Sequence, residues 1–437
     1  MIMMLDMDKN RIPETVRTIH LIAVCGTGMG ALACMLRDLG FEVTGSDQKI
    51  YPPMSHFLKK KGIRIMVGFR EENISYGPDL VIVGNAVIKE NPEVGKLHRL
   101  GLNFCSMPQA LNRFVAGDKK TLLVSGTHGK TTTSSILAWI LHEAGLDPSF
   151  MIGGILKNFD RNYRLGNGPY FVVEGDEYDT AFFDKGPKFL HFHPQMAVLT
   201  SVEFDHADIF DDLDHVKRTF QGFISGLSGS SLLLAYDGDK NVVGLIDSTH
   251  CRIENYGKNI SSKWRLGPIS VESPWTTFEI IKNNETLAAF KTRLFGEHNL
   301  LNALAVIAIA DQLKIPLQAI AGALETFEGI KRRQEIRGEK RQITVIDDFA
   351  HHPTAVRETI RAVKSVHSNG RLIAVFEPRT NTSMRSIFQN EYLQSFEMAD
   401  LICIRHPPLL KKIPSGQRFS SRKLVGDLKR LGKDAHY

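Results

Sequence analysis

A glycine loop between an apolar strand and a helix is the feature that most limits how this chain can fold. It lies in TLLVSGTHGKTTTSSILAWIL, residues 121 to 141. Backbone N–H groups at the start of such a helix bind phosphate, and the arrangement is typical of α/β sheets that hold nucleotides. The usual Walker pattern has a glycine where Val124 stands, so this loop is shorter. The stretch predicts a nucleotide loop of a less common kind.

The loop contains the groups that a triphosphate needs. Lys130 follows Gly129 at the start of the helix and can reach phosphate oxygens as a point charge, while Thr131 can ligate the bridging Mg²⁺. The rest of the predicted ATP loop consists of Gly126, Thr127, His128 and Thr132. The alternative is a capped helix with an unrelated lysine, and the acidic motifs further along the chain weigh against it.

A second glycine motif lies nearer the N-terminus, after the apolar run 18–25. It reads Gly26-Thr27-Gly28-Met29-Gly30 and opens a helix, and Asp47 ends the next expected strand. Glycines in this pattern let backbone N–H groups approach a pyrophosphate, and the acid is placed to meet a ribose. The motif indicates a dinucleotide or a nucleotide diphosphate without saying which. A glycine turn with no ligand and an NAD-dependent oxidoreductase are the alternatives, and the second phosphate loop at Lys130 counts against the oxidoreductase.

Acidic residues follow two expected strands of the middle third. Glu174 ends YFVVE, and Glu203, Asp205 and His206 come shortly after AVLTS. Carboxylates at strand ends beside a phosphate loop suit Mg²⁺ ligands. Zinc is less favoured here, because the chain has no CxxC pair and no HExxH helix.

The last third adds polar motifs that are weaker on their own. Asn299 and Asn302 lie three residues apart at a helix start, where they share a face and can read a base edge or cap the helix. KRR, residues 331–333, and DDFAHHP, residues 347–353, offer donors for phosphate or carboxylate, or a solvated basic patch.

Length and composition limit the class of protein. The 437 residues suggest about three domains, expected at 1–117, 118–328 and 329–437, and strands alternate with helices as in parallel α/β sheets. The five scattered cysteines favour reduced thiols and a cytoplasmic location, and we see no signal peptide and no membrane span. A net charge of +6 fits an anionic small substrate as well as nucleic acid.

Six motifs together resemble the Mur ligase family. They are GTHGKTT, VVEGDEYD, EFDHADIF, GEHNLLNA, GIKRRQE and DDFAHHP, in that family's order. The resemblance implies a Rossmann-like N-terminal domain for a UDP-linked substrate, a central P-loop ATPase domain with a mostly parallel sheet, and a smaller Rossmann-like C-terminal domain. It also accounts for the short loop. Members of the family continue beyond the point that matches Tyr437, so a truncated C-terminal sheet is expected.

The resemblance implies an ATP-dependent amide ligase that works through an acyl phosphate. HLIAVCGTGMG, GSDQKIYPPMS, DEYDTAFFDK and FEPRTNTSMR look most like the branch that joins UDP-N-acetylmuramate to L-alanyl-γ-D-glutamyl-meso-diaminopimelate in peptidoglycan recycling. The ligase that adds L-alanine is the alternative within the family. ATP and Mg²⁺ are the implied cofactors, small molecules are the implied partners rather than nucleic acid or membrane, and the oligomeric state stays open.

Motif matching also implies roles for single residues. Lys130, Glu174, His206 and Arg333 are expected to be catalytic, with Thr131 and Glu174 on one Mg²⁺ and His206 on a second. The other implied positions are Asn299 and Asn302 for adenine, Asp348 and His351 for the nucleotide, Gly26, Thr27, Gly28, Met29, Gly30 and Asp47 for UDP, and Arg379 and Arg385 for tripeptide carboxylates. Whether Lys185 or Lys188 is carbamylated, and what His128 does, stay open.

Overall fold

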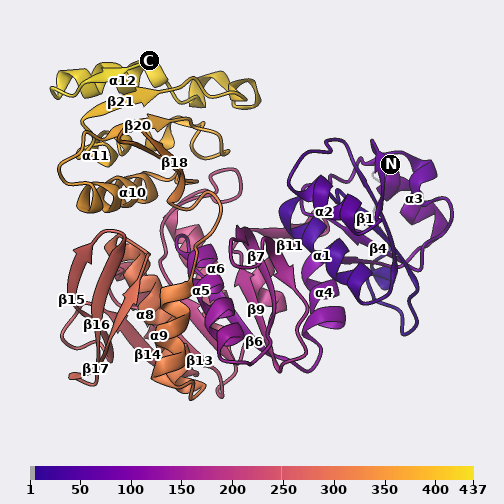
Figure 1. Cartoon of the computed structure of the whole chain (residues 1–437). Coiled ribbons are helices and arrows are strands. Elements are labelled where there is room, and N and C mark those ends of the chain that lie inside the picture. Colours follow the sequence, from indigo (N-terminus) through magenta and orange to yellow (C-terminus); the bar gives the residue numbers. More distant parts are fainter. Residues whose placement is uncertain (1–4, 248) are drawn as a thin grey trace.

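Three groups of strands follow one another along the chain of this computed structural model, which describes residues 5–247 and 249–437 (Figure 1). The α/β class and the three-domain layout expected from the sequence are confirmed. None of the helices in the described ranges has the length and apolar character needed to span a bilayer.

The N-terminal domain is built on a five-stranded parallel sheet in the order β3-β2-β1-β4-β5. The strand order reverses beside β1, and ligands of such sheets bind at the carboxyl ends of strands near this point. The glycine motif lies there, because it directly follows β1. The strands are β1 (Thr18–Ile22), β2 (Glu42–Asp47), β3 (Arg64–Val67), β4 (Leu80–Val83) and β5 (Phe104–Ser106); the helices are α1 (Thr27–Asp38), α2 (Met54–Lys60), α3 (Pro92–Leu100) and α4 (Met107–Leu111).

The central domain carries a ten-stranded sheet in the order β17-β16-β15-β14-β13-β12-β6-β9-β7-β8. The run from β15 to β7 is parallel, and antiparallel strands extend the sheet at both ends. The strands are β6 (Lys120–Ser125), β7 (Ser149–Leu156), β8 (Arg161–Arg164), β9 (Tyr170–Gly175), β12 (Met196–Leu199), β13 (Leu232–Tyr236), β14 (Arg252–Gly257), β15 (Trp264–Glu272), β16 (Trp275–Lys282) and β17 (Glu285–Thr292). A separate hairpin pairs β10 (Asp179–Ala181) with β11 (Asp184–Pro187).

Five helices belong to the central domain. Helix α8 is hydrophobic on nearly all sides and is buried along most of its length, as a helix in the interior of a large domain must be. The helices are α5 (Lys130–Glu143), α6 (Leu213–Ser225), α7 (Lys240–Ile246), α8 (Glu297–Gln312) and α9 (Leu317–Thr326).

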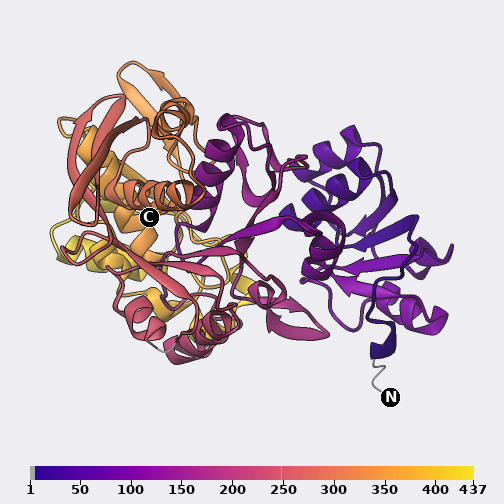
Figure 2. The same cartoon turned by 90° about the horizontal axis from the view of Figure 1, so that it is seen from below.

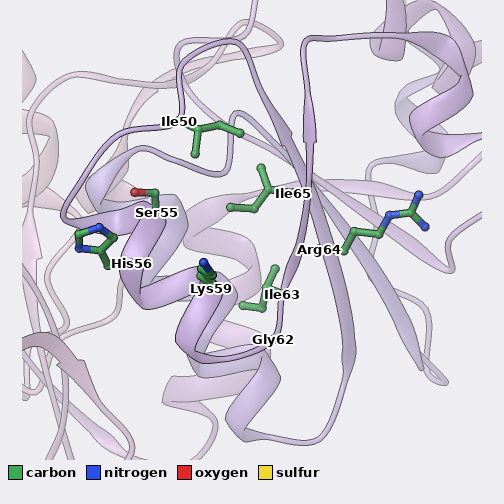
Figure 3. Close-up of a pocket in the computed structure, with 8 residues that line it drawn as sticks. All are labelled: Ile50, Ser55, His56, Lys59, Gly62, Ile63, Arg64 and Ile65. Atoms are coloured by element: carbon green, nitrogen blue, oxygen red, sulfur yellow. The ribbon is translucent and has the colours of Figure 1, made fainter.

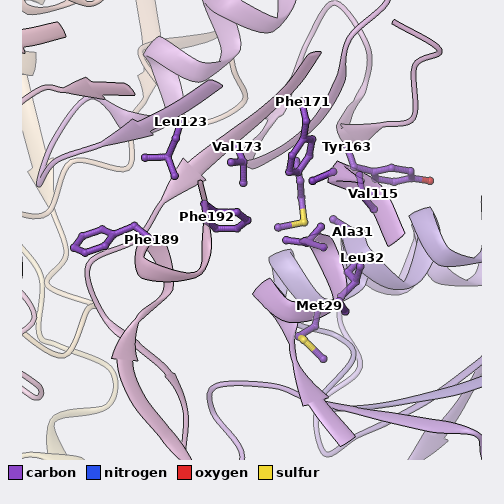
Figure 4. Close-up of a cluster of buried hydrophobic side chains, with 14 of the residues drawn as sticks. Met29, Ala31, Leu32, Val115, Leu123, Tyr163, Phe171, Val173, Phe189 and Phe192 are labelled. Carbon is purple, nitrogen blue, oxygen red and sulfur yellow. The ribbon is translucent and has the colours of Figure 1, made fainter. Parts of the chain in front are cut away.

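The N-terminal and central domains share one hydrophobic core. Met29 and Leu32 of α1 belong to the same cluster of buried side chains as Tyr163, Phe171 and Val173 of the central domain (Figure 4). The helix that the glycine motif opens is therefore fixed against the central sheet by apolar burial.

The C-terminal domain has its strands in two sheets. A hairpin pairs β18 with β19, and a parallel sheet has the order β20-β21-β22. The two sheets are not paired with each other in the described ranges, so the expected Rossmann-like sheet is divided here. The elements are β18 (Glu335–Lys340), β19 (Ile343–Asp347), β20 (Ile373–Phe376), β21 (Leu401–Ile404), β22 (Ala435–His436), α10 (Pro353–Val366), α11 (Tyr392–Ser395) and α12 (Ser421–Arg430).

Both views place the N-terminal domain to one side of the central domain (Figures 1 and 2), and Figure 1 shows the C-terminal domain on another side of it. The central domain contacts each of the other two. Short helical turns complete the chain at η1 (Met7–Lys9), η2 (Glu71–Ile74), η3 (Asn112–Ala116), η4 (Lys188–His191), η5 (Ser386–Phe388), η6 (Leu410–Lys412) and η7 (Ser415–Gln417).

Candidate functional site

The loop between β6 and α5 requires glycine at two positions. Gly126 has φ 128° and Gly129 has φ 81°, a region that other residues rarely adopt. A Cβ at Gly126 would lie 2.2 Å from Thr200 Oγ1, and one at Gly129 would lie 2.6 Å from Asn302 Oδ1. The glycines therefore let the loop backbone pack closely against the neighbouring strand end and α8.

Lys130 is folded over its own loop. Its Nζ donates to the Gly126 carbonyl oxygen at 2.5 Å and to Glu177 Oε2 at 2.9 Å. Burial alone would lower the pKa of Lys130, but the carboxylates of Glu177 and Asp176 outweigh burial and raise it. The loop thus carries a firmly protonated ammonium where phosphate oxygens would lie.

Thr131 and Glu174 face each other across two elements. Thr131 Oγ1 donates to Glu174 Oε2 at 3.2 Å, and Glu174 Oε1 accepts the Gly153 N–H at 2.6 Å. Burial raises the pKa of Glu174, and the nearby Asp176 raises it further. A cation would relieve that repulsion, and hydroxyl and carboxylate oxygens are the donors that Mg²⁺ prefers, so the residues present fit this ion.

His206 extends the same group of side chains. Its Nε2 lies 3.7 Å from Glu177 Oε1, and its ring packs on Tyr178 with centroids 5.0 Å apart. The structure therefore links His206 to Lys130 through Glu177.

Sequence reasoning missed Glu177 and Asp176. Both follow the Glu174 strand end in EGDEYD, and the density of acids there was the available signal. Asp176 in turn pairs with Lys188 Nζ at 3.1 Å, while Lys185 pairs with Asp179 at an exposed position. Lys188 is thus the one of the two lysines that joins the buried acidic group.

The two asparagines lie at the start of α8, against the loop. Asn299 and Asn302 are both buried, and Asn302 Nδ2 donates to Asn299 Oδ1 at 3.4 Å. Asn299 Nδ2 also donates to Gln334 Oε1 at 2.9 Å, which connects α8 to the start of the C-terminal domain.

The C-terminal residues reach the site to different degrees. His351 Nε2 lies 3.7 Å from Asp205 Oδ2 of the central domain. Asp348 accepts the backbone N–H of Gln334 at 2.8 Å, and the Arg333 guanidinium lies over the Phe349 ring. His351 therefore contacts the central domain, whereas these contacts of Arg333 and Asp348 are to residues of the C-terminal domain itself.

The N-terminal glycine motif is held by Asp47. Its Oδ2 accepts the Cys25 N–H at 2.9 Å and its Oδ1 accepts the Lys49 N–H at 3.0 Å, so the acid organises the loop from β2. A Cβ at Gly30 would lie 2.7 Å from Met54, whereas Gly26 and Thr27 are exposed to solvent. Close helix packing and an accessible loop backbone are what the motif predicts.

The two candidate peptide-binding arginines differ. Arg379 is exposed and pairs with Glu377 at 2.9 Å. Arg385 lines a cavity of about 370 Å³ between the central and C-terminal domains, together with Asp211 and Gln417. Its Nε is buried without a hydrogen-bond partner among the described residues.

A second hollow of about 450 Å³ lies between α2 and β3, at the edge of the N-terminal sheet (Figure 3). Ile63 and Ile65 line it with Lys59, and Arg64 points away from the other labelled side chains. The strand order puts it two strands from the glycine motif.

Comparison with known proteins gives one family for all three domains. Residues 18–119 match the Mur ligase family catalytic domain, 124–310 the Mur ligase middle domain, and 332–412 the Mur ligase glutamate ligase domain. The chain belongs to the Mur ligase family.

Similar proteins come from two branches of the Mur ligases. The UDP-N-acetylmuramate–L-alanyl-γ-D-glutamyl-meso-2,6-diaminoheptandioate ligase of Escherichia coli is 40% identical over 390 residues, which cover 89% of this chain and 85% of that protein. The UDP-N-acetylmuramate–L-alanine ligase of Acetivibrio thermocellus is 35% identical and covers 97% of this chain and 88% of its own length. The crystal structure of the murein peptide ligase Mpl of Psychrobacter arcticus aligns with a TM-score of 0.73 and 33% identity, covering 96% of this chain and 90% of that one.

Proposed function

We propose that this Mur ligase joins UDP-N-acetylmuramate to L-alanyl-γ-D-glutamyl-meso-diaminopimelate with hydrolysis of ATP to ADP and phosphate, in peptidoglycan recycling. The observation that carries the proposal is the loop in which Lys130 faces the buried Glu177 and Thr131 faces the half-buried Glu174. The choice of tripeptide follows the higher identity to the ligase that is named for it.

Amide formation needs an activated carboxyl group, because a carboxylate is a poor electrophile. In the proposed reaction the lactyl carboxylate of the muramate takes the γ-phosphoryl group of ATP and releases ADP. The tripeptide amine then attacks the acyl phosphate, and the tetrahedral intermediate expels phosphate. One C–N bond forms, and the carboxylate oxygen leaves with the phosphate.

The central domain would stabilise the charge that moves in the first step. The Lys130 ammonium would lie against the phosphate oxygens, and removal of one such donor costs about 10²–10³-fold in rate. Mg²⁺, held by Thr131 and Glu174 with His206 at a second ion, would supply further positive charge for the phosphoryl group. Asn299 and Asn302 are proposed to face adenine.

The C-terminal domain would close over the nucleotide. We assign Arg333, Asp348 and His351 to this closure, and the short distance between His351 and Asp205 supports it. Closure excludes water, which would otherwise hydrolyse the acyl phosphate.

The other two substrates are assigned to the flanking regions. The exposed backbone of Gly26 and Thr27, at the start of α1, would bind the UDP diphosphate, with Asp47 holding the loop in shape. Arg385 is proposed to bind a tripeptide carboxylate in the cavity at the domain boundary, since its Nε is buried and unpartnered there.

We assign the activity to the cytoplasm, the compartment that keeps thiols reduced, and all five cysteines are free in the structure.

The L-alanine ligase is the second candidate, supported by a relative that is 35% identical across nearly the whole chain. Parallel assays with UDP-N-acetylmuramate, ATP and either tripeptide or L-alanine separate the two. We expect ADP release and a UDP-linked amide with the tripeptide. A product with L-alanine only would assign the chain to the second branch.

A further inference from the structure

Two histidines and a glutamate meet where the ATP loop touches the C-terminal domain. His128 comes from the loop before α5, Glu203 from the segment after β12, and His352 from the cap of α10. His128 Nε2 lies 3.3 Å from Glu203 Oε2, and His352 Nδ1 lies 3.5 Å from the same oxygen. The three ligand atoms all lie within 4.8 Å of one another.

The spacing of these atoms matches a known coordination geometry. Zn²⁺ binds imidazole nitrogen and carboxylate oxygen at roughly 2.0–2.1 Å, which puts tetrahedral ligand atoms about 3.3 Å apart. The distances from Glu203 Oε2 to His128 Nε2 and to His352 Nδ1, 3.3 and 3.5 Å, are close to that value. The same Oε2 accepts the Thr354 hydroxyl at 2.8 Å, so this hydroxyl would turn away when a cation binds.

Hydrogen bonds fix the His352 ring in the form that binds metals. Its Nε2–H donates to the Phe204 carbonyl oxygen at 3.1 Å, and its Nδ1 accepts the Thr354 N–H at 3.2 Å. The proton is therefore on Nε2, and the single lone pair of Nδ1, which now accepts the Thr354 N–H, is the one that a cation would have to take. A second hydrogen bond from a ligating imidazole to a carbonyl is the usual support for a metal-bound histidine.

The local charge also favours a cation. Burial lowers the pKa of His352, and the neighbouring His128 lowers it further, so this imidazole is neutral near pH 7. A neutral nitrogen and a carboxylate oxygen thus lie 3.5 Å apart, and each accepts a hydrogen bond from Thr354.

We propose that His128, Glu203 and His352 form a Zn²⁺ site that joins the ATP loop to the C-terminal domain, with a fourth position left for water. The ion would replace the proton between His128 and Glu203 and would take the lone pair that now accepts the Thr354 N–H. The site shares no ligand with the Mg²⁺ residues Thr131, Glu174 and His206, and it does not depend on the proposed ligase function.

The three proposed ligands come from two different domains. His128 and Glu203 belong to the central domain, while His352 begins α10 of the C-terminal domain. Bound Zn²⁺ would therefore hold the two domains in the arrangement seen here, and the melting temperature would rise with metal concentration.

The test uses the full-length protein after chelation, without nucleotide or Mg²⁺, titrated with Co²⁺ and with Zn²⁺ in competition. We expect one tight site per chain, with the visible absorption of tetrahedral Co²⁺. His352→Ala and His128→Asn should each weaken binding by roughly 10-fold or more, as loss of supporting groups already does at metal sites.

Two control variants make the test specific. His193→Ala removes an exposed histidine elsewhere, and Glu174→Gln removes a proposed Mg²⁺ ligand; both should bind Co²⁺ as the parent chain does. Circular dichroism checks that each variant is folded. One folded ligand variant, either His352→Ala or His128→Asn, is enough for the test. Equal Co²⁺ binding in a folded ligand variant and in the parent chain would overturn the proposal, as would the absence of a one-to-one site in the parent chain.

Discussion

Lys130 and Glu177 form an ion pair in which Nζ and Oε2 lie 2.9 Å apart, with only 3% of the Glu177 side chain exposed. A nucleotide phosphate in the loop would therefore meet a lysine that is already oriented and charged. The pair connects the strand-end acids to the glycine loop before any substrate is bound.

Replacement of Lys130 by alanine should remove the activity. We expect kcat/KM for ADP release to fall about 10²–10³-fold or more, because the ammonium that balances the moving phosphoryl charge is lost. Lys340→Ala, at an exposed position of β18, is the matched control and should keep full activity. Unchanged turnover in Lys130→Ala would remove the loop from the mechanism.

Glu177→Gln should lower the stability of the ligand-free protein. The change removes the closest counter-charge of the largely buried Lys130, while Asp176 and Glu174 remain near it. The loss should therefore stay below the roughly 3–5 kcal/mol of a buried charge left with no partner. Calorimetry of the ligand-free protein measures the loss, with Glu285→Gln on an exposed strand end as control. Equal melting temperatures for the two variants would contradict the structural role given to the pair.

Gly126→Ala should damage the loop. The added Cβ would lie 2.2 Å from Thr200 Oγ1 and 2.8 Å from the Ser201 backbone nitrogen, which cannot move aside freely. We expect nucleotide affinity, followed by fluorescence titration, to fall about 10-fold or more, since strain of this kind costs on the order of 1–3 kcal/mol. Gly222→Ala in α6 has open space around it and should bind nucleotide normally and gain up to about 1 kcal/mol of stability.

Arg385→Ala should affect the peptide substrate alone. We expect the KM for the tripeptide to rise about 10-fold, the loss of one charge-assisted contact, while the KM for UDP-N-acetylmuramate stays unchanged. Arg379→Ala, whose side chain pairs with Glu377 outside the cavity, serves as the comparison. A rise in the KM for the UDP substrate instead would place Arg385 in a different subsite.

The cysteines should react in a set order. Burial raises the pKa of Cys25 to about 11, with Asp47 adding to it, and burial raises the pKa of Cys34 to about 11. The thiolate is the reactive form, so both stay unreactive near pH 8, while the partly exposed Cys403 should be alkylated first. Mass spectrometry after brief treatment with iodoacetamide reads the order, and early labelling of Cys34 would contradict the packing of α1.

Much of the central site was predictable from local patterns. Lys130 and Thr131 follow one parallel strand and Glu174 ends its neighbour, so their meeting is a consequence of strands that end at one edge of a sheet. The pairing of β6 with β9 confirms that adjacency. The family resemblance supplied the nature of the ligands and the order of the domains.

Contacts that depend on the packing of distant segments were not predictable. Glu177 reaches Lys130 because the chain turns back after β9, and His352 meets His128 because α10 packs against the central domain. No local spacing encodes either contact. Between about 230 and 290 the sequence indicates only short strand-like pieces, and bulges interrupt the pairing of β15 to β17 in this region.

The central claim is that this chain forms an amide through an acyl phosphate made from ATP, and transfer of ¹⁸O tests it most directly. UDP-N-acetylmuramate labelled with ¹⁸O in its lactyl carboxylate is incubated with ATP, Mg²⁺ and the tripeptide, and the released phosphate is analysed by mass spectrometry. The account predicts one amide product and one ¹⁸O-labelled phosphate for each ADP released. Phosphate without label, or ADP release without an amide, would contradict it.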